Sequence, residues 1–148
     1  MQLKAALVLI IFTTGCLSFG WVSIADVKAP RQNARVSVMK RCIGPDCIVR
    51  ISLTKDRSKL LLFDDRRDRL PRGAIVRWAG DSSTVAVHVC DSLGGNITLG
   101  YDLNHNRSET KESVTRILRD LITTQYHPDG DPLAWACSEE GIAALNKG

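Results

Sequence analysis

The chain has few aromatic residues, no internal repeat and no cysteines paired at the spacing of zinc ligands. Only 5% of its 148 residues are aromatic: three Phe, three Trp and two Tyr. The lack of a repeat argues against a propeller, which needs several similar units. Structural zinc sites usually contain cysteines separated by two residues, and none occur here. The formal net charge of +4 is too mild and too evenly mixed to indicate nucleic-acid binding.

Residues 5–25 form an uncharged run of 21 positions between Lys4 and Asp26. A helix rises ~1.5 Å per residue, so this run would span about 30 Å, the thickness of a bilayer core. A short basic start followed by an apolar stretch is typical of export segments. We therefore expect residues 1–25 to be a signal peptide or membrane anchor. The rest of the chain should lie on the exported side of the cell envelope, periplasmic or extracellular, and tethered to the membrane.

Three fates of this segment fit the sequence. Ser23-Ile24-Ala25 places small residues where signal peptidase requires them, which predicts cleavage after Ala25. Thr14-Gly15-Cys16 resembles the end of a bacterial lipoprotein signal, so Cys16 is a candidate lipidation site. Alternatively the run remains as a transmembrane helix, with Trp21 near the membrane interface.

The other four cysteines are Cys42, Cys47, Cys90 and Cys137. An even set in an exported domain of this size indicates a disulfide framework. Three connectivities are open, and the sequence alone does not choose among them. The turn residues Gly44-Pro45-Asp46 favour Cys42–Cys47, which leaves Cys90–Cys137. We expect no cofactor.

The remainder of the chain predicts strands followed by a helix. Residues 26–34 are polar and are expected to form a tether. Short segments with alternating apolar residues follow between residues 35 and 101, and each predicts a half-buried strand. The period then changes to that of an amphipathic helix, with a stripe formed by Val114, Ile117, Leu118, Leu121 and Ile122.

This helix should cover residues 109–125, with Asn106 as its cap. A short second helix is expected from Pro132, with Trp135 as its core contact. The sequence therefore predicts a single α+β domain over residues 35–148. Its core is an antiparallel meander of about six short strands packed by one C-terminal amphipathic helix, and a hydrophobic export or anchor helix precedes it.

The loop after Tyr101 contains a weak candidate metal site. Asp102, Asn104 and Asn106 have the alternate spacing of the first calcium ligands of an EF-hand. However, Arg107 occupies the position of the required glycine, and Ser113 that of the bidentate glutamate. A strand end, a loop and a helix cap are the favoured interpretation, and we expect no metal.

The histidines are weak catalytic candidates. His88 or His105 beside a carboxylate such as Asp91 or Asp102 would form a pair able to act as a general base. No nucleophile-elbow motif accompanies them. A packed or surface histidine is therefore the favoured interpretation.

The segment at residues 64–73 concentrates charge. Its arginines are Arg66, Arg67, Arg69 and Arg72, and three aspartates nearly cancel them. A solvated loop is the favoured interpretation. The alternative is a surface contact with anionic lipid or polymer. This alternative is favoured more strongly if the leader stays in the membrane, because the domain is then held near a charged surface.

These observations favour a non-catalytic cell-envelope protein that acts as a binding module of the inhibitor, immunity or assembly-accessory type. Its partner would be a protein or an envelope polymer, with a membrane contact through the N-terminal segment and no nucleic acid. One alternative is a small envelope hydrolase that uses a His/Asp pair. Another is a calcium-dependent envelope module.

Overall fold

The computed structural model describes residues 20–65 and 69–147. Most of the predicted export helix, Cys16, Arg66 and Arg67 lie outside the described residues. Within the described ranges, no helix is long and apolar enough to cross a bilayer.

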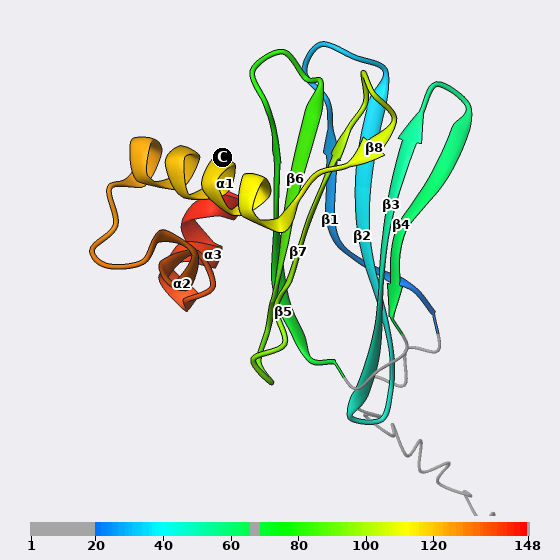
Figure 1. The fold of residues 1–148 in the computed structure, drawn as a ribbon. Coiled ribbons are helices and arrows are strands. Elements are labelled where there is room, and N and C mark those ends of the chain that lie inside the picture. The colour runs from blue at the N-terminus through cyan, green and yellow to red at the C-terminus, as the bar shows by residue number, and fades with distance from the viewer. Residues whose placement is uncertain (1–19, 66–68, 148) are drawn as a thin grey trace, which may run out of the picture.

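Eight strands form two antiparallel sheets of four strands each, which face one another (Figure 1). The first sheet contains β1 (Val22–Lys28), β2 (Ala34–Ile43), β3 (Asp46–Lys55) and β4 (Ser58–Asp65). The second sheet contains β5 (Pro71–Trp78), β6 (Thr84–Asp91), β7 (Ile97–Asp102) and β8 (Arg107–Ser108). Within each sheet consecutive strands pair, whereas β4 and β5 lie in different sheets, so the antiparallel strands form two meanders of four. The predicted meander is divided into two sheets, whereas the sequence had predicted a single one.

The division buries two apolar sheet faces against each other. Val36, Val38, Val49 and Ile51 of the first sheet are fully buried, as are Val85 and Val87 of the second. A sheet that is apolar on one face must cover that face, and a second sheet does so over its whole width. One helix is too narrow to cover six strands, which explains why a single sheet under one helix does not form.

β1 begins within the predicted export segment and continues into the predicted tether. Val27 pairs with Val36 and Ala25 with Val38 in the register of β1 and β2. Asp26 and Lys28 alternate with these residues and are exposed. The folded part of the chain therefore begins well before the boundary predicted at residue 35. Residues 26–28 belong to an edge strand, which the sequence analysis had taken for tether.

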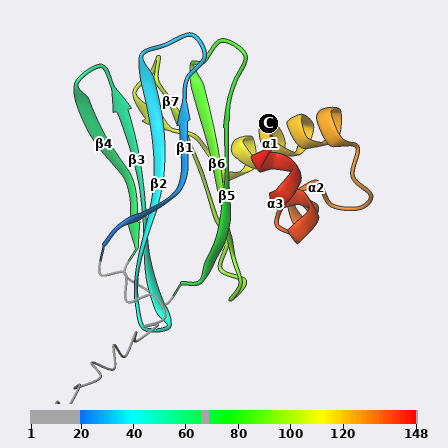
Figure 2. The same ribbon diagram turned by 180° about the vertical axis from the view of Figure 1, so that it is seen from behind.

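Three helices cover the outer face of the second sheet: α1 (Lys111–Tyr126), α2 (Pro132–Ala136) and α3 (Glu139–Asn146) (Figures 1 and 2). α1 is the predicted helix, and its buried residues are Val114, Leu118 and Ile122. They form a second core with Ile75, Ala86 and residues of the two short helices. The second sheet is thus the central layer, with a sheet on one side and helices on the other.

The ends of α1 differ from the prediction. Its N-cap is Thr110, whose side chain accepts a hydrogen bond from the backbone N–H of Ser113. Asn106, the predicted cap, lies in the turn before β8 with a φ of 48°. Leu121, predicted in the buried stripe, is 37% exposed because α1 turns it toward solvent.

The C-terminal segment is held by a short cap and a disulfide. α2 begins at Pro132, as predicted, and Asp131 caps it. Trp135 is half-buried and lies 5.3 Å from Tyr126, measured between ring centroids. Cys137, at the end of α2, is bonded to Cys90 of β6, while Cys42 is bonded to Cys47 within the β2–β3 hairpin. α3 was not predicted.

Candidate functional site

His88 lies on the outer face of β6, under the helices. Thr98 is directly opposite on β7, and the His88 Nδ1 atom is 2.8 Å from the Thr98 hydroxyl oxygen. The residue is only 4% exposed. Its Nε2 atom is buried and has no hydrogen-bond partner. Because an unpaired buried polar atom destabilises the fold, such an atom calls for an explanation.

The imidazole belongs to the lining of an open hollow of about 430 Å³ between the second sheet and the helices. We call it the His88 hollow. The sheet contributes His88, Thr98 and the turn at residues 94–96. α1 contributes Lys111, Thr115 and Arg119, and the start of α2 contributes Asp131, Leu133 and Ala134. Two strands, β6 and β7, and two helices, α1 and α2, therefore converge on one polar depression.

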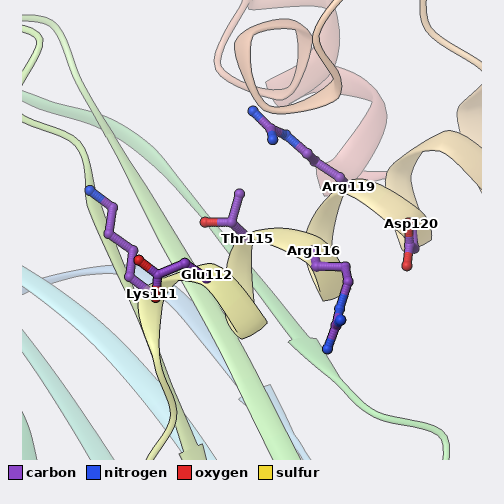
Figure 3. Close-up of a pocket in the computed structure, with 6 residues that line it drawn as sticks. All are labelled: Lys111, Glu112, Thr115, Arg116, Arg119 and Asp120. Atoms are coloured by element: carbon purple, nitrogen blue, oxygen red, sulfur yellow. The ribbon is translucent and has the colours of Figure 1, made fainter.

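The residues of α1 reach the hollow because they are spaced four apart. Lys111, Thr115 and Arg119 lie on successive turns of one helix face. The same three residues also line a second depression along the exposed side of α1, with Glu112, Arg116 and Asp120. Figure 3 shows Arg119 extending toward the C-terminal segment, while Arg116 points the opposite way. α1 thus presents a continuous polar surface that leads into the His88 hollow.

The charges around the hollow are not balanced. Arg119 forms an ion pair with Asp131 at 3.0 Å, with both side chains about half exposed. Lys111 has no ion-pair partner within the part of the chain that the structure describes. Burial lowers the pKa of His88; Asp131 opposes this shift and Lys111 adds to it. The imidazole is therefore neutral at neutral pH, and the hollow carries a net positive charge.

The residue set suits an anion better than a metal. The ammonium group of Lys111, the guanidinium group of Arg119 and the hydroxyl of Thr115 line the space and can donate hydrogen bonds to a carboxylate or phosphate. The hydroxyl of Thr98 is shared with His88 Nδ1, and His88 Nε2 carries a proton when Thr98 donates to Nδ1. A nitrogen of His88 and the sulfurs of Cys90 and Cys137 do lie within 4.8 Å of one another. However, the two sulfurs are bonded to each other. Thiolates are the metal-binding form of cysteine, so this cluster offers only the imidazole.

Asp91, a predicted partner of His88, is used elsewhere. Its carboxylate accepts hydrogen bonds from the backbone N–H groups of Leu70 and Leu93, at 3.1 and 2.9 Å. It also accepts one from Arg69. Asp91 therefore organises the turn between β6 and β7 and does not orient the imidazole of His88.

Asp102 and His105 do form a pair, with 2.6 Å between Asp102 Oδ2 and His105 Nδ1. The hydrogen bond from His105 lowers the pKa of Asp102, as do the backbone N–H groups of Asn104 and His105. Both carboxylate oxygens are thus occupied within the turn after β7. The side chain of His105 is 67% exposed. Asn104 and Asn106 are exposed on the same turn. The carboxylate holds its own turn together, which leaves it poorly placed as a calcium ligand.

Of the four candidate arginines, the structure describes two. Arg69 bonds to Asp65, Asp91 and the backbone oxygen of Gly95, and its side chain is only 17% exposed. Arg72 is exposed at the start of β5. Arg69 is therefore an internal clamp, by which we mean that its side chain links Asp65, Asp91 and Gly95. Arg72 is a surface residue.

Comparisons with models of protein families, with curated proteins and with solved structures found no match to this chain. The site therefore rests on its own geometry. Sequence reasoning identified His88 but missed Thr98, Lys111, Thr115 and Arg119. The four-residue spacing on α1 was the available signal, but its significance depends on how α1 packs over β6 and β7.

Proposed function

We propose that this chain is a membrane-tethered, non-catalytic binding module of the cell envelope whose His88 hollow receives a negatively charged group of its partner. The observation that carries this proposal is a depression that Lys111 and Arg119 make positive, lined also by His88, whose buried Nε2 atom has no hydrogen-bond partner. A carboxylate or phosphate there would gain charge-assisted hydrogen bonds. The depression is open, so the group can belong to a larger polymer or protein.

The proposed location rests on the disulfides and on the N-terminal segment. Two disulfides favour an oxidising compartment outside the cytosol. The position of β1 supports retention of the residues around the predicted cleavage site, because cleavage after Ala25 would remove Val22–Ala25 from the edge of the first sheet. Lipidation at Cys16 would leave β1 whole. A retained helix would do so if it ended before Val22, which leaves residues 5–21, about 26 Å of helix, to enter the bilayer. Both fates keep the domain at the membrane.

The test is a titration of the isotope-labelled protein with inorganic phosphate and with glucuronate, followed by NMR. We expect saturable shifts of the His88 ring and of the Thr98 and Thr115 amides. The double variant Lys111→Ala/Arg119→Ala should lose these shifts. The matched control Arg107→Ala/Arg116→Ala removes the same charge from exposed positions outside the His88 hollow and should keep them.

A native protein without saturable shifts for either anion would contradict the proposed site. If both double variants lost the chemical-shift changes equally, the overall positive charge of the protein, and not the His88 hollow, would account for anion binding. Because Arg119 pairs with Asp131, the thermal unfolding of each variant should be measured alongside the titration.

A small hydrolase is the second candidate, favoured by the short contact between Asp102 and His105. An imidazole oriented by a carboxylate is the arrangement of a general base. A hollow of about 350 Å³ lies nearby between the two sheets, lined in part by Tyr101, Leu103 and Asn106. Hydrolysis of p-nitrophenyl acetate by the native protein but not by His105→Ala would favour this candidate. Equal rates would remove it.

A further inference from the structure

Four segments that are distant in the sequence meet at one end of the sandwich. They are the start of β1, the tip of the β2–β3 hairpin, the segment before β5 and the turn between β6 and β7, toward the lower end in Figures 1 and 2. The backbone N–H of Cys47 donates to the oxygen of Arg69, and that of Ser92 to the oxygen of Leu70. These contacts join the last three segments, and Val22 at the start of β1 pairs with Lys40 of β2. We call this end of the sandwich the entry end because the chain enters the fold there.

Each segment of the entry end exposes one large apolar side chain. Val22 is 42% exposed, Ile43 is 52%, Leu70 is 45% and Leu93 is 65%. Single exposed apolar residues are normal on protein surfaces. Four of them at one end, each from a different segment, indicate an apolar contact surface. The other large apolar residues with comparable exposure in the described ranges are Leu60, Leu61 and Leu121, which lie on β4 and α1.

An aromatic and several cations accompany this surface. Trp21 precedes β1, and the guanidinium of Arg50 lies 4.3 Å from the centroid of its ring. Indole rings beside cations suit the boundary between lipid and water. The strongly paired Arg69 adds no free charge, whereas Arg72 is exposed. Asp46, at the tip of the hairpin, and Asp64, which forms an ion pair with Arg50, are exposed acids that oppose them.

The chain outside the described residues indicates what covers this surface. The uncharged run that begins at residue 5 ends within β1, whose first residues lie at the entry end. A membrane-spanning or acylated segment attached at Gly20 would hold the entry end within a few residues of the bilayer. Apolar side chains at such a distance gain free energy by entering the lipid interface, because their apolar surface is removed from water.

We propose that the entry end docks onto the lipid bilayer and that Ile43, Leu70 and Leu93 enter the interfacial layer. This proposal rests on the membrane tether of the proposed function and adds an orientation to it. The strands then stand upright on the membrane, and α1 lies to one side. The turn at residues 94–96, which lines the His88 hollow, follows Leu93 directly, so the hollow opens close to the lipid headgroups.

The test uses the full chain in nanodiscs of phosphatidylethanolamine and phosphatidylglycerol, with a nitroxide on a fraction of the headgroups. The methyl groups of Ile, Leu and Val are labelled and observed by NMR. We expect the signals of Ile43, Leu70 and Leu93 to be lost through paramagnetic broadening. Those of Leu61 and Leu121, which are also exposed, should keep most of their intensity.

The double variant Ile43→Ser/Leu93→Ser should restore the signal of Leu70, and the matched control Leu61→Ser should not. Uniform intensities in a chain that remains in the nanodisc would overturn docking and leave the tether intact. Loss of the Leu121 signal instead would place another face on the lipid and overturn the proposal. A full chain that does not enter nanodiscs at all would overturn both the tether and docking. Failure of the phosphate titration would affect only the hollow.

Discussion

Gly100 of β7 lies directly beneath Val114 of α1. A Cβ atom added to Gly100 would come within 2.5 Å of the Val114 Cγ2 atom and within 2.9 Å of the Val85 backbone oxygen. Val114 is fully buried at this contact. The absence of a side chain on Gly100 therefore sets how closely α1 approaches the sheet, and with it the depth of the His88 hollow.

Gly100→Ala should destabilise the fold by about 1–3 kcal/mol, because a methyl group must displace either α1 or the backbone of β6. Urea unfolding at constant temperature measures this change. Gly80→Ala is the control, since a Cβ atom there would have no neighbour within 4 Å. Equal stability of the two variants would show that α1 does not depend on this close approach.

The long disulfide should matter more than the short one. Cys90 and Cys137 are 47 residues apart in the chain, whereas Cys42 and Cys47 are five apart. Loop-closure entropy predicts losses of roughly 4 kcal/mol for Cys90→Ser/Cys137→Ser and roughly 2 kcal/mol for Cys42→Ser/Cys47→Ser. Thermal unfolding of both double variants tests the ranking. A reversed order would mean that strain or residual structure in the unfolded chain outweighs loop closure.

Arg69→Met should destabilise the domain by about 1–3 kcal/mol, because it removes hydrogen bonds to buried acceptors and keeps the apolar stem. The carboxylate of Asp91 would stay buried, with a side chain 2% exposed and no cation. Arg72→Met changes an exposed arginine nearby and should have little effect. Circular dichroism during thermal unfolding distinguishes the two variants, and equal unfolding temperatures would contradict the clamp.

The stability of the protein should fall as the pH drops below the ordinary pKa of histidine, about 6.5. Burial lowers the pKa of His88 in the folded state. Between the two pKa values the unfolded chain binds a proton that the folded chain does not, so acidification favours unfolding. Above the ordinary pKa, this contribution is fully present.

Urea unfolding at pH 7, 6 and 5 measures this dependence. His88→Gln should weaken it, because glutamine keeps a polar group but does not titrate. His127→Gln, at an exposed position after α1, is the matched control substitution. If the native protein and His88→Gln lose stability in parallel, the imidazole is not the responsible group.

Much of the local structure follows from the sequence, whereas the arrangement of the layers does not. Alternating valines predict the strands at Val85–Val89, and the apolar stripe predicts α1. Alternation, however, shows only that one face of a strand is buried and not what buries it. The two-sheet core therefore could not be distinguished from one sheet under a helix. β1 could not be predicted for a different reason, because Val22–Ala25 continues an uncharged run and has the composition of a leader.

The candidate site shows the same limit. His88 attracts attention as a rare residue type. The lack of a hydrogen-bond partner for its Nε2 atom and its cationic surroundings, however, result from the packing of α1 and α2 over β6. Lys111 and Arg119 belong to the solvent-facing side of a helix when the sequence is considered alone. The pair Asp102 and His105 is local, three residues apart, and the sequence analysis anticipated it.

The strictly sequential pairing of the strands has a consequence for biogenesis. Each strand finds its partner in the segment made just before or just after it, so a chain crossing a membrane from its N-terminus can complete the first sheet before the second has emerged. Cys47 meets Cys42 almost at once. Cys90 must remain a thiol until Cys137 arrives, 47 residues later. In the exported location that we propose, premature pairing of Cys90 would trap the chain during that interval.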